Sequence, residues 1–281
     1  TYAMSDTITV FGGLRQHEEM RQENSQAALR NPGDPATGPY TGYMFEDNST
    51  TYEFDNTSYR VGVEWRPDDS TLYYASRSSA ARAPVPIDQT TLAILADQGL
   101  PNLSSEDASE LVSTEIGAKM SMMEDALDLE IVYALSEWTD IPMYSGYGTP
   151  NGPLSMSVGG TDADVTSLEM SASYTISDTL SLTYAGGLTD TEVAAVPDPS
   201  VVVNFPAAIQ VGGELYGYSP TTHSITLDYS DDMDNGWEAY GSVDYAYREK
   251  MMGFSSVVYA DEYIAADSDY KLLNLAMGMS C

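Results

Sequence analysis

The chain has 281 residues, of which 43 are acidic and 11 basic, so its formal net charge at pH 7 is −32. A surface this negative repels phosphates, which excludes nucleic acid as a partner. The only cysteine is Cys281, so no disulfide can form within the chain. No apolar run reaches the roughly 18 residues that a membrane-spanning helix needs.

The first expected element is a strand over residues 3–16. The polar stretch His17–Asn31 follows it, inside a long connection expected over 17–51. Its composition favours a short helix in an exposed loop. A second short helix is expected over Thr90–Gln98, where Gly99 would end it.

Clear alternation begins at residue 59. Side chains alternate across a strand, so residues 59–65 have one apolar and one polar face. The apolar face carries Tyr59, Val61, Val63 and Trp65. Residues 66–70 contain Pro, Asp and Ser and predict a tight turn, after which residues 71–77 return as a second alternating strand.

The same hairpin pattern recurs three times. Residues 114–122 and 127–135 flank a turn at Glu124 and Asp125, residues 168–176 and 180–184 flank Ser177 and Asp178, and residues 225–229 and 237–247 flank residues 231–236. A last strand is expected over 268–280. About ten strands are therefore predicted.

The predicted connections alternate between short and long. The long ones cover 17–51, 81–111, 139–164, 190–221 and 249–267 and are rich in Gly, Pro, Asp and Ser. Alternation of this kind places the short connections at one end of the strands and the long ones at the other. This arrangement is typical of an outer-membrane β-barrel, whose two ends meet different compartments. The 21 tyrosines fit interfacial aromatic girdles, although tyrosine is also simply a good strand residue. The sequence thus predicts an all-β, antiparallel transmembrane barrel.

Several segments resemble TonB-dependent receptors. Residues 72–77 with Arg82-Ala83-Pro84 resemble a strand and loop entry of that family, and Glu115-Ile116-Gly117-Ala118-Lys119 resembles its E-x-G-x-K strand. Residues 129–138, 167–170, 219–248 and 270–278 resemble later strands, although a family glycine is replaced near Ser167. The order and spacing of these weak motifs carry the resemblance.

The resemblance implies a barrel of about 22 strands filled by an N-terminal plug domain. Residues 1–281 would then be a partial barrel domain that lacks the plug, the early strands and the last strands. It also implies an outer-membrane location, a TonB complex acting through the plug, and import of a ferric siderophore, a cobalamin-like compound or an oligosaccharide. Outer-membrane lipid would surround the barrel.

Aromatic residues in or beside external loops are the candidate substrate contacts, because loops carry specificity on rigid scaffolds. They are Tyr40, Tyr43, Trp138, Tyr144, Tyr147, Tyr216 and Tyr218. The charged residues Arg77, Arg82, Glu115 and Lys119 are candidate contacts to the plug or lumen. Packing within loops and ion pairs within the lumen are the competing explanations.

Catalysis is not expected. His17 and His223 are the only histidines, and the sequence indicates no triad, metal site or cofactor. Two alternatives to an active receptor remain open: a passive porin-type barrel, and a soluble secreted β-rich adhesin or carbohydrate-binding protein.

Overall fold

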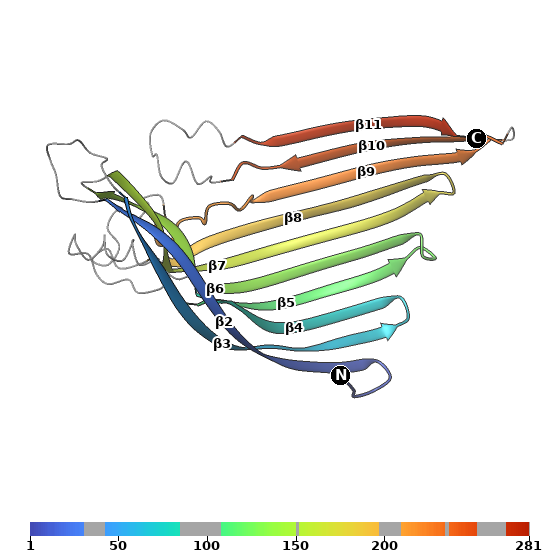
Figure 1. The fold of residues 1–281 in the computed structure, drawn as a ribbon. Coiled ribbons are helices and arrows are strands. Elements are labelled where there is room, and N and C mark those ends of the chain that lie inside the picture. Colours follow the sequence, from blue (N-terminus) through green and yellow to red (C-terminus); the bar gives the residue numbers. More distant parts are fainter. Residues whose placement is uncertain are drawn as a thin grey trace.

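A computed structural model describes residues 1–30, 43–84, 108–149, 152–196, 209–233, 236–251 and 268–280. Its 11 strands form one antiparallel sheet in the order of the sequence (Figure 1). They are β1 (Tyr2–Ala3), β2 (Ile8–Arg30), β3 (Tyr43–Asp68), β4 (Thr71–Arg82), β5 (Ser109–Met122), β6 (Leu127–Thr149), β7 (Gly152–Ser177), β8 (Leu180–Ala195), β9 (Thr221–Asp232), β10 (Glu238–Arg248) and β11 (Tyr270–Ser280). In the described residues β11 pairs with neither β1 nor β2, so the sheet is open along two edges.

The described part of the chain contains no helix that is long and apolar enough to span a membrane.

One face of the sheet, here called the apolar face, carries large hydrophobic side chains that no described residue covers. Ile116, Leu168 and Leu275 are 56%, 41% and 68% exposed on this face. Strand pairing aligns further members from neighbouring strands, including Val61, Val63, Trp65, Tyr133, Met170, Leu188, Ile225, Val243, Leu273 and Met277. A surface of this kind is stable in lipid and costly in water.

The opposite face, here called the polar face, carries small hydroxyl and charged side chains. It includes Ser113, Ser136, Ser167, Ser171, Ser173, Thr183, Ser224 and Thr226, together with Glu115, Lys119, Glu130 and Glu169. The strict alternation between these two faces is the pattern of a barrel strand with lipid on one side.

The predicted tight turns after β3, β5 and β7 are confirmed and lie at one end of the sheet, the turn end; residues 234 and 235 of the fourth predicted turn lie outside the described residues. At the first of them, Ser70 Oγ donates to Asp68 Oδ1 at 2.8 Å and fixes the reversal into β4. At the second, Met123, Glu124 and Asp125 all adopt positive φ, between 58° and 66°. The strand ends opposite these turns are called the loop end below.

Glycine lets an aromatic ring lie flat across a neighbouring strand. Gly117 on β5 pairs with Tyr74 on β4, and a Cβ at Gly117 would overlap the Tyr74 ring. Tyr240 covers Gly278 in the same way between β10 and β11. These pairs fill the space that glycine leaves, so the strands keep close contact on the polar face.

The predicted helix over His17–Asn31 is wrong. β2 continues without interruption to Arg30 and pairs residue by residue with β3, so that Arg30 lies opposite Tyr43. Pairing supplies hydrogen bonds to a polar segment that has no helical period of its own. The expected loop over 139–164 is also mostly strand, because β6 and β7 pair from Thr149 and Gly152 inward. The helix expected over Thr90–Gln98 lies outside the described residues.

Candidate functional site

A small hydrophobic cluster closes the loop end of β6, β7 and β8. It joins residues from three strands and from the segment 209–218, here called the docked segment. The buried members are Ile141, Met143, Ala163, Val193, Ile209 and Leu215, each at most 4% exposed. Because Ala163 and Val193 lie on the polar face, the docked segment covers that face.

A β-bulge near Asp140 directs the following side chains of β6 into the cluster. The register between β6 and β7 shifts between Trp138 and Ile141. Asp140 has a φ of 51° and its amide donates to Asp162 Oδ1 at 2.9 Å. Such a bulge bends a strand and redirects the following side chains, which places Ile141 in the cluster.

Hydrogen bonds hold the docked segment to β8. The amide of Val193 donates to the carbonyl of Gly213, and the amide of Gly212 donates to the carbonyl of Val193, both at 2.8 Å. The amide of Leu215 donates to Thr191 Oγ1 at 3.0 Å. The docked segment is therefore built into the sheet edge.

Three predicted site residues meet at this cluster. Trp138 on β6 and Tyr216 and Tyr218 on the docked segment are partly buried against it. Burial raises the pKa of the Tyr218 hydroxyl above its ordinary value of 10.0. Rings fixed on one side by packing and open on the other can bind an apolar or planar ligand.

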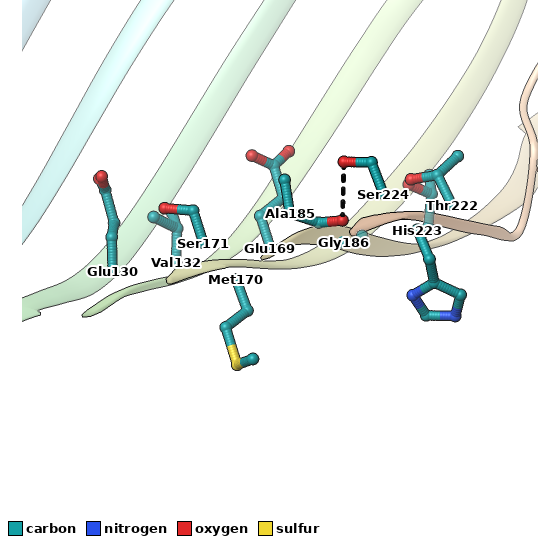
Figure 2. A pocket seen from close by; sticks show the side chains of 12 residues that line it. Glu130, Val132, Glu169, Met170, Ser171, Ala185, Gly186, Thr222, His223 and Ser224 are labelled. Atoms are coloured by element: carbon teal, nitrogen blue, oxygen red, sulfur yellow. Dashed lines mark hydrogen bonds between the residues drawn. The ribbon is translucent and has the colours of Figure 1, made fainter. Parts of the chain in front are cut away.

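A shallow hollow lies on the polar face nearer the turn end. Its volume is about 480 Å³, and its lining includes Glu130, Glu169, Ser171 and Ser224. In Figure 2 the side chains of Glu130, Glu169 and Ser171 project to one side of the sheet, while Met170 and His223 project to the other. The hollow is thus a polar recess of the inner wall.

Lys119 forms a cross-strand ion pair in this wall. Its Nζ lies 2.7 Å from Glu130 Oε1, and the two residues are register partners on β5 and β6. Glu115 lies on the same face of β5, and Arg82 lies at the loop end of β4 on that face, with an exposed side chain.

Arg77 occupies the other face. Its register partners are Val61 on β3 and Thr114 on β5, both on the apolar face. The side chain is exposed there, and Nη1 donates to Thr114 Oγ1 at 2.9 Å. The prediction that Arg77 contacts the plug or lumen therefore needs correction, because the sheet separates this residue from the polar face.

The remaining predicted residues are not brought together by the described structure. Tyr40 lies outside the described residues. Tyr43 begins β3, and Tyr144 and Tyr147 belong to β6, so these three lie in strands and not in loops; their side chains are outside the described part.

In contrast, Ile141, Met143 and Leu215 were missed by sequence reasoning, because they fall in stretches that were expected to be loops.

Metal binding has no support in the part of the chain that the structure describes. No group of three or more His, Cys, Asp or Glu side chains there is placed to hold an ion.

These features define a class of protein. A single antiparallel sheet with an exposed apolar face, a polar face and tight turns at one end is a wall of a transmembrane β-barrel. The family described as "TonB dependent receptor-like, beta-barrel" matches residues 1–279. The chain belongs to this family, whose barrels lie in the bacterial outer membrane and whose members are transport receptors, not enzymes.

Solved structures agree on the fold. The siderophore receptor PiuA from Acinetobacter baumannii aligns with a TM-score of 0.63 at 12% identity, over 98% of this chain and 34% of that one. The ferric yersiniabactin uptake receptor FyuA from Yersinia pestis gives 0.69 at 11%, over 98% and 36%. The copper transporter OprC gives 0.63 at 16%, over 97% and 37%. The chain thus spans roughly a third of each. No curated protein sequence is similar enough to count as a match.

Proposed function

We propose that this chain forms part of the wall of an outer-membrane receptor that actively imports a scarce, bulky nutrient. The observation that carries the proposal is the docked segment, which holds aromatic side chains on the polar face at the loop end. An unselective passive pore does not require an ordered aromatic surface at this point. A ligand-binding receptor needs rigidly placed groups that recognise its substrate.

Trp138, Tyr216 and Tyr218 are the proposed substrate contacts. Their packing against buried residues already restricts the motion of these side chains. The side chains would therefore lose little conformational entropy when a ligand binds. Tyr40, Tyr43, Tyr144 and Tyr147 remain predicted contacts of the same kind. Aromatic rings suit planar chelates, corrin-like rings and sugar faces alike.

A metal complex is the favoured substrate class. Two of the similar structures are described as siderophore and ferric yersiniabactin receptors, and a third as a copper transporter. A ferric siderophore, a cobalamin-like compound or an oligosaccharide all fit an aromatic surface. The similar proteins favour the first of these.

Energy coupling would come from a TonB complex that acts through a plug domain of the complete receptor. Arg82, Glu115 and Lys119 lie on the polar face that such a plug would meet. Lys119 is already paired with Glu130, so Glu115 and Arg82 are the better candidates for plug contacts.

Uptake measurements test the proposal. Cells that express the full-length protein would be supplied with radioactive ferric siderophores, cobalamin or labelled oligosaccharides, with TonB present or deleted. We expect saturable uptake of one compound that stops without TonB. In Tyr216→Ala and Tyr218→Ala proteins we expect weaker binding, while Tyr2→Ala, on the short β1, serves as the matched control.

Two outcomes would contradict the proposal. Uptake that persists without TonB and does not saturate would establish the passive porin-type barrel. A protein that is stable and monodisperse without detergent would favour the soluble adhesin or carbohydrate-binding alternative. The continuous exposed apolar face of β3 to β11 argues against that alternative.

A further inference from the structure

Positive charge is almost absent from the part of the chain that carries the aromatic surface, formed by Trp138, Tyr216 and Tyr218. Residues 83–247 contain a single Lys or Arg, which is Lys119, although acidic residues occur along this whole span. The span includes β5 to β9 and the docked segment. The charge that a ligand meets at the aromatic surface is therefore set mainly by carboxylates.

Lys119 does not present a free positive charge to a ligand. Its Nζ lies 2.7 Å from Glu130 Oε1, so the two charges compensate each other. The cations that flank this part of the polar face are Arg82 on β4 and Arg248 on β10. β5 lies between Arg82 and β6, and the guanidinium of Arg248 lies 5.9 Å from the ring centroid of Tyr270 on β11. The three strands that the docked segment covers, β6, β7 and β8, thus contribute no cation to the polar face.

Carboxylates on the same part of the polar face have no compensating cation. Asp128 on β6, Glu169 on β7 and Asp228 on β9 are exposed on this face, and no described Lys or Arg forms an ion pair with them. Glu169 lines the hollow of about 480 Å³ and projects to the same side of the sheet as Ser171 (Figure 2). A ligand that moves from the aromatic surface along this wall meets negative charge as far as the turn end.

Glu214 brings a carboxylate to the aromatic surface itself. It directly precedes Leu215, which is buried in the cluster, and lies two residues before Tyr216. The side chain of Glu214 is exposed. The docked segment contains no other charged residue, so its own charge is negative.

We propose that the nutrient bound at the aromatic surface is a metal complex of net positive charge, an inference that rests on the proposed function. The face of an aromatic ring attracts a cation, most strongly when the ring is tryptophan. Uncompensated carboxylates add a longer-range attraction. An anionic complex would be repelled by this wall and would find no cation on β6, β7 or β8 to bind it, so the same charges exclude anionic competitors.

Calorimetric titration of the full-length protein in non-ionic detergent tests the sign of the ligand charge. The first series of probes is ferrioxamine B, a ferric complex with a free ammonium group, with its N-acetylated and N-succinylated forms. These three complexes share one chelate and are cationic, neutral and anionic. The second series is aquacobalamin, cyanocobalamin and a monocarboxylate of cyanocobalamin, with charges in the same order.

Glu214→Gln removes the carboxylate beside the rings. Glu124→Gln is the matched control, because Glu124 is exposed in the turn after β5, at the opposite end of the strands. Both variants remove one negative charge from the protein, so a difference between them reports the position of the charge and not the net charge.

We expect the cationic member of a series to bind about tenfold more tightly than the anionic one at roughly 10 mM salt, where the Debye length is about 30 Å. At about 1 M salt the Debye length is about 3 Å, and the preference should nearly disappear. Glu214→Gln should weaken binding of the cationic member about threefold and strengthen binding of the anionic one. Glu124→Gln should match wild type.

Equal or tighter binding of the anionic member, or a preference that does not change with salt, would overturn the inference and leave the receptor function standing. So would binding of neither series when an anionic siderophore or an oligosaccharide shows saturable, TonB-dependent uptake. Absence of such uptake for every compound would contradict the proposed function itself, and the inference with it. If Glu214→Gln fails to assemble, the order of affinities in wild-type protein and its salt dependence still decide the sign of the charge.

Discussion

Val193 on β8 and Gly213 on the docked segment are joined at the loop end, where the amide of Val193 donates to the carbonyl of Gly213 at 2.8 Å. Val193 is fully buried. One residue thus anchors the docked segment both through its backbone and through its side chain. The aromatic surface at the loop end depends on this attachment, so weakening the cluster should loosen Tyr216 and Tyr218.

Leu215→Ala should open the docked segment. Leu215 is 2% exposed, and truncating a buried leucine costs about 2–5 kcal/mol. We expect this loss to appear locally, as faster hydrogen exchange at the amides of Leu215 and Val193. Val211→Ala is the control within the same segment, since Val211 is 62% exposed. Unchanged exchange in Leu215→Ala would mean that the cluster does not hold the segment.

Arginine on the apolar face should impair assembly. In the full-length protein, Val61→Arg, Ile131→Arg and Leu182→Arg should each destabilise the barrel by about 2–4 kcal/mol, because each would place a charge in hydrocarbon. The measurement is the folded fraction in lipid vesicles, read from the gel shift of unheated samples. Thr183→Arg, one residue from Leu182 on the polar face, should fold normally. Normal assembly of all three variants would show that the faces are assigned the wrong way round.

Gly117→Ala should destabilise the contact between β4 and β5. The added Cβ would overlap the Tyr74 ring, and overpacking of this kind costs about 1–3 kcal/mol. Combining it with Tyr74→Ala should remove most of the added penalty, which a double-mutant cycle of unfolding free energies would measure. Gly13→Ala is the control, because nothing lies within 4 Å of a Cβ at Gly13. Additive effects in the cycle would exclude the ring as the cause.

The docked segment should weaken at high pH. Burial raises the pKa of Tyr218 above 10.0, so the folded state favours the neutral phenol. This contribution to stability is fully present below the pKa of the unfolded chain and is lost as the pH rises through the folded pKa. We expect the 13C resonance of the Tyr218 ring, identified by its loss in Tyr218→Phe, to titrate with a midpoint above 10.0. A midpoint at or below that value would show that the ring is not desolvated.

Alternation along single strands could be predicted from sequence because it is local. Val61, Val63 and Trp65 share a face in any regular strand, and Pro67 and Asp68 favour a reversal wherever they lie. The turns, the hairpin order, the barrel class and the receptor family followed from such signals.

The extent of β2 and the ends of β6 and β7 could not be predicted in this way. Residues 17–30 and 139–149 lack a clear period, and only pairing with a neighbouring strand makes them extended. Strand pairing joins residues far apart in the chain, so composition within a short window does not reveal it.

The sequence by itself determined which residues alternate, where the chain turns and which family it joins, because these depend on neighbours along the chain. Tertiary structure alone decided the face of Arg77 and the gathering of Trp138, Tyr216 and Tyr218. On β4 both faces mix polar and apolar residues, so pairing with β3 and β5 sets the orientation of Arg77. The three aromatic residues meet because the docked segment, which begins 60 residues after the end of β6 at Thr149, returns to the sheet and packs against β6, β7 and β8.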